Sequence, residues 1–261
     1  MLKKWTLPAL LLALLAAGPA WALGPVTLGL GADYASRYIW RGYDLVEDNR
    51  PAFQPSATVS LTPADALTLS FNVWASYGVS EPDSANEWDE VDYTLALDYA
   101  LSDRVSLSLG HIYYHFPTAR GPKRSDVNDT KEIFLGVSVG LPANLSTDLT
   151  VYYDYDNGKG IYANLGLGYS RALSEAVTVN LGANVGYMSY TEDDPETAFY
   201  TDEDGDAFKG FSDANFQLGV DVDLGHGFSL SNALVYTIPL DDAINTADRE
   251  VWTLTSLSFE F

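Results

Sequence analysis

The chain has 261 residues, and its 36 acidic residues outnumber its 14 basic ones, which gives a formal net charge of −22 at pH 7. Such an acidic excess argues against binding to nucleic acid or anionic surfaces and favours cations as partners. The sequence contains no cysteine, which excludes disulfide bonds, thiolate metal sites and cysteine nucleophiles.

The first 22 residues have the pattern of a secretory signal peptide. Lys3 and Lys4 precede an apolar run over residues 7–17, and Ala20-Trp21-Ala22 follows as a small-x-small cleavage site. The apolar run is too short for a transmembrane helix. We therefore expect residues 1–22 to be removed and residues 23–261 to be exported.

From residue 26 onward, apolar and polar residues alternate over about twelve segments. Alternation at period two predicts β-strands with one apolar and one polar face. The segments are residues 26–34, 53–62, 67–77, 91–101, 105–110, 133–141, 149–156, 161–170, 177–187, 214–224, 228–237 and 252–261. The alternation slips near His111 and Asn232, where we expect β-bulges.

The polar face of these strands indicates where they lie. It consists mainly of Gly, Ser, Thr, Asn and Asp, whereas a soluble sandwich is usually covered by Lys, Glu and Arg. Small polar residues suit a confined, hydrated interior with the aliphatic face turned to lipid. Tyr and Trp gather at the strand ends, as an interfacial girdle requires: Tyr38, Trp40, Tyr99, Tyr113, Tyr153, Tyr155, Tyr187 and Tyr190.

Short connections alternate with long ones, and only the link at residues 157–159 breaks this alternation. The sequence therefore predicts one closed antiparallel transmembrane β-barrel of about twelve strands over residues 23–261, with short periplasmic turns and longer external loops. The expected location is the outer membrane of a Gram-negative bacterium. Phe261 ends an alternating strand, and we expect it to be the signal read by the barrel-assembly machinery.

Arg37 and Arg41 are two of the few basic residues, and they stand in the aromatic stretch "ADYASRYIWRGYDL". If the first strand continues through this stretch, both arginines project into the lumen, because an arginine facing lipid costs roughly 2–4 kcal/mol. The predicted lumen or constriction residues are Asp33, Arg37, Arg41, Trp74, Asp92, Asp98, Asp154 and Asp221. Two interpretations stay open: the arginines are structural counter-ions for the acids, or they form a constriction with a transverse field.

The same stretch carries a family resemblance. "DYASRYIWRGYDL", the proline of "NRPAF" and then "NVWASYG" resemble the start of the TorF-type porin family, the Gcw_chp group. The motif positions here are Tyr38, Trp40, Arg41, Gly42 and Trp74, with an extra "SRY" spacing before the tryptophan. The resemblance implies an outer-membrane barrel assumed to be a channel, with solutes that are poorly defined.

The long acidic segment after residue 190 contains a candidate calcium site. Asp202, Asp204, Asp206 and Asp213 stand at positions 1, 3, 5 and 12 of a calcium-loop template. Position 6 is not the expected glycine, so a solvated acidic loop, or one that binds divalent cations loosely between lipopolysaccharides, stays an alternative.

The histidines do not have the spacing of a metal site. His111 and His115 are four residues apart, which on a strand separates them by about 13 Å. A rim-located lipid hydrolase that uses His115 and a serine of a neighbouring strand remains a rival hypothesis.

The sequence thus predicts a passive, narrow pore for small solutes or ions, cation-preferring because of its acidic wall, with no catalytic residues and no cofactor apart from the calcium candidate. The expected partners are outer-membrane lipid and lipopolysaccharide, the assembly machinery, and small solutes or cations, but not nucleic acid. The main alternative is a non-conducting structural or adhesive barrel whose acidic loops are bridged by divalent cations.

Overall fold

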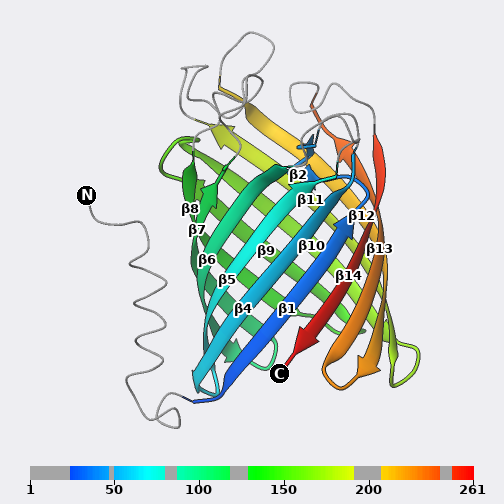
Figure 1. Ribbon diagram of the computed structural model, residues 1–261. Helices are drawn as coiled ribbons and strands as arrows, with labels where there is room; N and C mark the ends of the chain where they lie inside the picture. Colours follow the sequence, from blue (N-terminus) through cyan, green and yellow to red (C-terminus); the bar gives the residue numbers. More distant parts are fainter. Residues whose placement is uncertain (1–23, 47–49, 80–86, 118–128, 191–206, 242–248) are drawn as a thin grey trace.

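The computed structural model describes residues 24–46, 50–79, 87–117, 129–190, 207–241 and 249–261, which form a barrel of tilted strands (Figure 1). Its wall consists of β1 (Val26–Ala35), β4 (Ala52–Ala64), β5 (Leu67–Gly78), β6 (Glu87–Ser102), β7 (Val105–His115), β8 (Thr130–Gly140), β9 (Leu145–Asp154), β10 (Gly160–Ala172), β11 (Val177–Tyr190), β12 (Lys209–Gly225), β13 (Phe228–Pro239) and β14 (Glu250–Glu260). Two further short strands, β2 (Ile39–Trp40) and β3 (Tyr43–Asp44), pair only with each other.

The twelve wall strands close into a ring. Each pairs antiparallel with its neighbour in the chain, and β1 completes the ring by pairing with both β14 and β4. Closure leaves no strand edge unpaired in the described wall, which is what hydrocarbon requires of a spanning sheet. The prediction of an all-β, twelve-stranded antiparallel barrel is confirmed. No helix in the described residues is long and apolar enough to cross a membrane.

The two faces of the wall differ as the alternation predicts. Leu30, Leu135 and Leu165 on the outer face are 51%, 60% and 51% exposed, so a band of aliphatic side chains points away from the barrel. The inner face carries small polar residues that hydrogen-bond across strands. For example, Asn72 Nδ2 donates to Thr58 Oγ1 at 2.8 Å. The aliphatic side chains therefore face outward and the small polar side chains face inward.

The two ends of the barrel differ in the length of the connections between the strands. The connections at the lower end of Figure 1 are tight turns, and the strand ends that the longer links connect lie at the upper end. Between β12 and β13 the turn is made by His226 and Gly227, whose φ angles are 56° and 83°. Positive φ at both central residues is the type I′ geometry that suits a two-residue hairpin. The predicted asymmetry between turns and loops is thus present.

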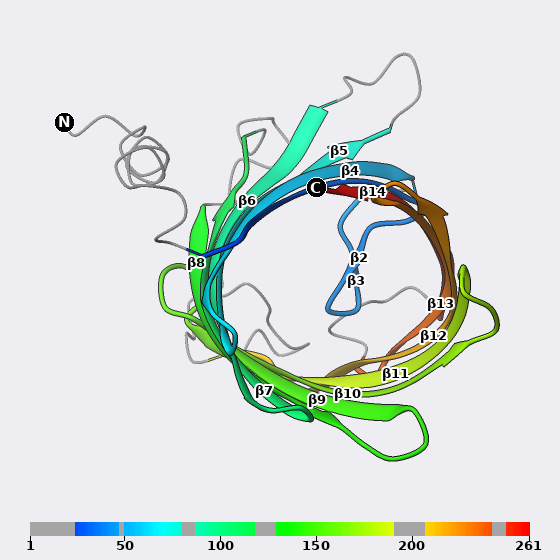
Figure 2. The same cartoon turned by 90° about the horizontal axis from the view of Figure 1, so that it is seen from below.

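The first strand is shorter than expected. β1 ends at Ala35, just before Ser36 N–H donates to Thr253 O at 2.9 Å, and the chain then leaves the wall. Viewed from below, the β2–β3 hairpin lies inside the ring (Figure 2). The prediction that the strand continues through Arg41 is wrong, because a turn with positive φ at Arg41 and Gly42 reverses the chain inside the lumen.

The two predicted bulges are also absent from their expected places. The ladder runs without a register shift through His111 and through Asn232. Both side chains stay in phase on the outer face and find partners there: Thr255 Oγ1 donates to Asn232 Oδ1 at 2.8 Å. A register shift occurs instead in the pairing of β11 with β12, where Ser212 is the extra residue.

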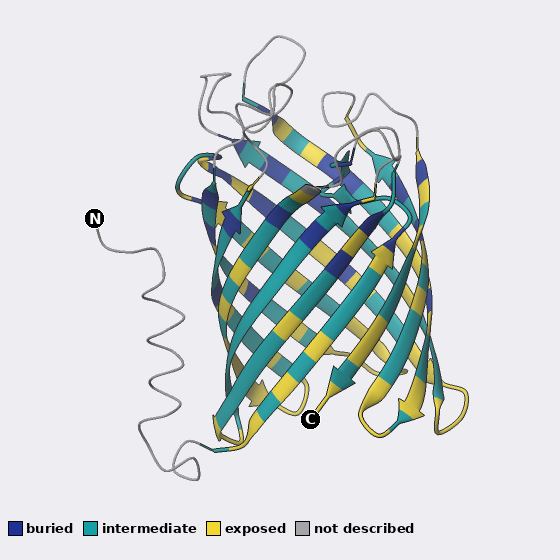
Figure 3. Ribbon diagram, in the orientation of Figure 1, coloured by how far each residue is buried: buried dark blue, intermediate teal, exposed yellow. Residues whose placement is uncertain are grey.

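Buried residues gather in the upper half of the barrel, around the hairpin (Figure 3). A cluster of Tyr162, Met188, Tyr190 and Phe208 packs there against Tyr43 of the hairpin. The prediction of an interfacial girdle is therefore wrong for Tyr38, Trp40 and Tyr190, which lie in the lumen. Tyr38 and Trp40 enter the lumen with the hairpin, and Tyr190 lies on the inward-facing side of β11. The prediction holds for Tyr99, Tyr153 and Tyr155, which are exposed on the outer face.

Candidate functional site

The β2–β3 hairpin reaches across the lumen from β1. Ile39 pairs with Asp44 and Trp40 with Tyr43, so Arg41 and Gly42 form a two-residue turn at its tip. Their φ angles are 51° and 91°, again the type I′ geometry, which glycine adopts without a Cβ penalty. The turn carries Arg41 to strands β8, β9 and β10, which lie opposite β1 in the closed strand order.

At the tip, Arg41 forms a bidentate ion pair with Glu132 of β8. Arg41 Nη1 donates to Glu132 Oε1 and Nη2 to Oε2, each at 2.7 Å. The two side chains are only 6% and 3% exposed. The Tyr114 hydroxyl donates to Glu132 Oε2 at 2.8 Å, so the carboxylate has three donors in a site that excludes bulk water.

Aromatic rings enclose the guanidinium. Its central carbon lies 4.2 Å from the ring centroid of Trp40, 4.3 Å from that of Tyr162 and 5.0 Å from that of Tyr152. Burial alone lowers the pKa of Arg41, but the adjacent Glu132 carboxylate more than offsets this, and the pKa is raised above its ordinary value. Arg41 is therefore a fully charged group held by one carboxylate and three ring faces.

The base of the hairpin has its own anchors. The Tyr38 hydroxyl donates to Glu90 Oε2 at 2.9 Å, and its ring lies 5.6 Å from that of Trp74. Burial, followed by the Glu90 carboxylate, raises the pKa of Tyr38, so the phenol stays protonated as a donor. Arg37 forms an ion pair with Glu250 at the start of β14. The five positions of the family motif thus hold or form one inserted hairpin.

A cavity of about 600 Å³ lies beside the hairpin. Trp40 and Arg41 line it from the hairpin, and aromatic side chains and hydrogen-bond acceptors line it from the wall. The wall residues that matter here are Tyr114, Tyr152, Tyr162, Asp148, Asn164 and Asp213. The buried Asn164 Oδ1 has no hydrogen-bond partner within the described part of the chain, so it is an unsatisfied acceptor in the wall of the cavity.

The structure separates the predicted lumen residues into two groups. Arg37, Arg41 and Trp74 meet the hairpin or form it. The predicted acids Asp33, Asp92, Asp98, Asp154 and Asp221 lie at inward-facing positions of the wall strands. In the described residues the arginines pair with Glu250 and Glu132, whereas Asp221, for example, accepts hydrogen bonds from Asn180 and Ser231. That these acids shape a constriction stays a prediction.

Sequence reasoning missed the residues that receive the hairpin: Glu90, Tyr114, Glu132, Tyr152, Tyr162 and Glu250. One signal was available for Glu132, because it shares the inward phase of β8 with Gly136 and Ser138. An acid in that phase is a lumen residue. Its pairing with Arg41, 91 positions earlier, depends on how the ring closes and has no local signal.

The candidate calcium site stays a prediction. Asp202, Asp204 and Asp206 lie outside the described residues. Asp213 lies in β12, where its carboxylate accepts hydrogen bonds from Ser212, Asn215 and Tyr162. Among the residues that the structure describes, no cluster of three or more His, Asp or Glu could hold a metal ion.

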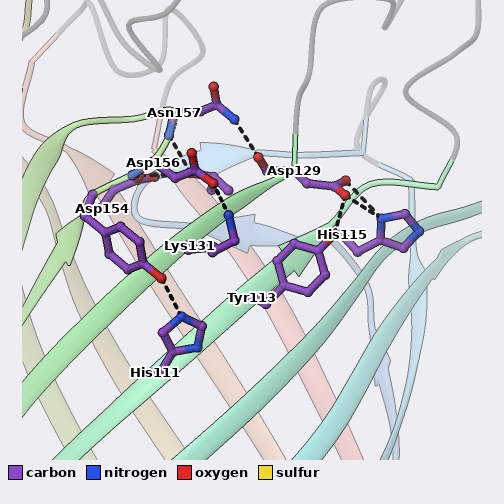
Figure 4. A network of polar contacts seen from close by, with 10 residues as sticks. His111, Tyr113, His115, Asp129, Lys131, Asp154, Asp156 and Asn157 are labelled. Carbon is purple, nitrogen blue, oxygen red and sulfur yellow. Dashed lines mark hydrogen bonds and ion pairs between the residues drawn. The ribbon is translucent and has the colours of Figure 1, made fainter. Parts of the chain in front are cut away.

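A polar network joins residues at or just beyond the ends of β7, β8 and β9 near the upper rim (Figure 4). His111 Nε2 lies 2.7 Å from the Tyr155 hydroxyl, and His115 Nδ1 lies 2.9 Å from Asp129 Oδ1. Burial raises the pKa of Asp129, but hydrogen bonds from Tyr113, the Phe116 N–H and His115 outweigh this and lower it. No serine hydroxyl of the described residues is a partner of His115, so the hydrolase hypothesis has no support from this geometry.

The last residue, Phe261, is hydrogen-bonded to β1 through its backbone. Phe261 N–H donates to Leu28 O at 3.0 Å, and its carbonyl accepts from Leu28 N–H at 2.8 Å. Its side chain is exposed on the outer face beside the ring of Phe259, 5.3 Å away. The recognition of Phe261 by the assembly machinery stays a prediction.

These features define a small closed antiparallel β-barrel with an inserted hairpin. A family model described as "Bacterial protein of unknown function (Gcw_chp)" matches residues 19–255, so the chain belongs to this family, and the resemblance read from its motif is confirmed. No curated protein matches the sequence.

Solved structures of outer-membrane channels and porins share the fold. The COG4313 outer membrane channel from Pseudomonas putida F1 matches with a TM-score of 0.55 and 13% identity, covering 94% of this chain and 97% of that one. The NanC porin matches at 0.53 and 9% identity, covering 89% and 98%. The KdgM porin matches at 0.51 and 9% identity, covering 90% and 99%. At these identities the likeness concerns the fold alone.

Proposed function

We propose that this protein is a passive diffusion channel of the bacterial outer membrane for small solutes or ions. The observation that carries the proposal is a closed barrel with a lipid-suited outer face, whose lumen is narrowed by its own β2–β3 hairpin. The shared fold with outer-membrane channels and porins supports the same location. Export through residues 1–22 as a signal peptide is part of the proposal.

The path for a solute runs past the hairpin. The lower lumen is lined by small polar side chains, and the cavity of about 600 Å³ lies beside the hairpin tip. A diffusing solute would therefore meet its narrowest passage between the hairpin and the wall of β9 to β14. The hairpin is held by side-chain contacts, and the passage can widen if these break.

The wall chemistry favours cations over anions. Asp33, Asp98 and Asp148 face inward, and the hairpin's Arg41 is neutralised by Glu132. A narrow passage lined by one sign of charge raises the local concentration of the opposite ion. Neutral solutes with hydrogen-bond donors also suit the acceptors of the cavity.

Single-channel recording in planar lipid bilayers tests the proposal. We expect discrete current steps and, in a salt gradient, a reversal potential of the sign given by cation preference. An anion-selective reversal potential would defeat the charge reasoning while leaving the pore in place. A sealed bilayer for the wild type and for a variant without the hairpin would instead favour the non-conducting structural barrel.

The variant without the hairpin has a natural design. Ala35 of β1 and Ala52 of β4 are directly paired. Residues 36–51 can therefore be replaced by Asn-Gly, the dipeptide that favours a type I′ turn, which yields an ordinary two-residue hairpin between β1 and β4. We call this the turn variant.

A further inference from the structure

The barrel wall contains a site whose parts come from four consecutive strands. Tyr114 (β7), Glu132 (β8), Tyr152 (β9) and Tyr162 (β10) all converge on one point of the lumen. The cation that fills it, Arg41, belongs to a separate element that has no ladder bonds with the wall. The receptor and its occupant are therefore distinct pieces of structure.

The receptor matches a guanidinium rather than any cation. Both carboxylate oxygens of Glu132 accept at 2.7 Å from different nitrogens, which is the parallel fork geometry that an ammonium cannot reproduce. The Tyr162 ring lies 4.3 Å from the guanidinium carbon, and planar cations bind well to such faces. Tyr114 holds Glu132 Oε2 in place from the other side.

The receptor also needs a cation. Glu132 is 3% exposed, and a buried carboxylate without a partner is strongly unfavourable. If Arg41 withdraws, the site keeps the Glu132 carboxylate and the rings of Tyr152 and Tyr162 that faced the guanidinium. The adjoining cavity of about 600 Å³ is lined by Arg41, Tyr114, Tyr152 and Tyr162, so a small solute can approach the same point.

Withdrawal of Arg41 is feasible because the hairpin is small. It has two paired residues on each strand, and side chains hold it to the wall through polar contacts (Arg41 on Glu132, Tyr38 on Glu90 and Arg37 on Glu250) and through packing of Trp40 and Tyr43 on wall aromatics. In the Arg37–Glu250 pair, Arg37 is 28% exposed and Glu250 is 5% exposed. Tethering gives Arg41 a high effective concentration, which a free competitor must overcome.

We infer that Glu132, Tyr114, Tyr152 and Tyr162 form a binding site for guanidinium-bearing solutes, and that Arg41 is its tethered occupant. Such solutes compete with Arg41 and release the hairpin from the wall. This names a solute class for the proposed channel and rests on that function for its physiological meaning. The binding site itself can be tested without any measurement of transport.

The test uses methylguanidinium as the probe and Arg41→Ala as the variant that empties the site. Thermal unfolding of the purified barrel in detergent is followed by the heat-dependent shift in gel mobility and by tryptophan fluorescence, at increasing millimolar probe. We expect saturable stabilisation of R41A, and in the wild type a half-saturating concentration higher by about tenfold or more because Arg41 competes.

Two controls distinguish this site from a general salt effect. Methylammonium has the same charge without the planar fork, and it should stabilise R41A clearly less. The double variant R41A/E132Q keeps the cavity but lacks the carboxylate, and it should not respond to methylguanidinium. If R41A does not fold, Arg41→Gln takes its place, because it keeps a neutral polar group at the tip.

Three results would overturn the inference: no response of R41A, an equal response of R41A/E132Q, or equal stabilisation by methylammonium. Bilayer recording of the wild type separates this failure from failure of the channel. Current steps without methylguanidinium binding would defeat the solute site alone, and binding without current would defeat the channel alone.

Discussion

The Arg41–Glu132 pair provides the sharpest energetic prediction. Its side chains are 6% and 3% exposed, and its bidentate bonds are both 2.7 Å long. Removing one partner of such a buried pair leaves an uncompensated charge, which costs roughly 3–5 kcal/mol. We therefore expect R41A and Glu132→Gln each to lower the free energy of unfolding by about that amount.

The double variant R41A/E132Q should cost less than the sum of the two single variants, because neither charge is then left without the other. We expect a coupling energy of about 2 kcal/mol or more, at the upper end of the range for residues in contact. Urea unfolding in phospholipid vesicles, followed by tryptophan fluorescence, measures all three values.

The second arginine supplies a matched control. Arg37 is 28% exposed, although its partner Glu250 is only 5% exposed, so water reaches one side of the pair and removal of Arg37 should cost less than removal of Arg41. Additive effects at the Arg41–Glu132 pair, or single costs below about 1 kcal/mol there, would refute the view that this pair anchors the hairpin.

Three further predictions concern other parts of the barrel. Gly42→Val places a β-branched residue at a φ of 91° and should cost at least about 1–2 kcal/mol in urea unfolding, whereas Gly42→Asn should cost less. Leu135→Arg, on the outer face, should lower the free energy of unfolding by about 2–4 kcal/mol. Ser138→Arg, which faces the lumen opposite Asp148, should change it little, and equal costs for the two variants would contradict the assignment of the faces. Because the pKa of Asp129 is lowered, its contribution to stability is present above its unfolded pKa of about 3.9 and is lost as the pH falls through the folded value. The stability difference between wild type and Asp129→Asn should therefore shrink below about pH 4, and a constant difference would argue against these contacts.

The wall of the barrel could be predicted from the sequence because its determinants are local. Each strand must alternate to present lipid-facing side chains such as Leu30 and Leu135, and the turns need only a few residues. Even the apparent slips at Asn232 and His111 leave the backbone unchanged, since Asn232 has a partner on the neighbouring strand, Thr255, and His111 has one just after β9, Tyr155.

The hairpin could not be predicted in the same way. "SRYIWRGYDL" has the residues of a strand, and Arg41-Gly42 becomes a turn only because β1 leaves the wall after Ala35. Which acid receives Arg41 depends on which strands lie opposite β1 after closure. The aromatic residues Tyr38 and Trp40 were assigned to the lipid interface for the same reason, although they fill the lumen.

Conductance of the turn variant, measured beside that of the wild type in the same bilayer, tests the central claim most directly. The claim is that a hairpin anchored through Arg41 narrows an otherwise open lumen. We expect small current steps for the wild type and steps several-fold larger for the turn variant. Equal steps for the two proteins, or no current from the turn variant, would contradict it.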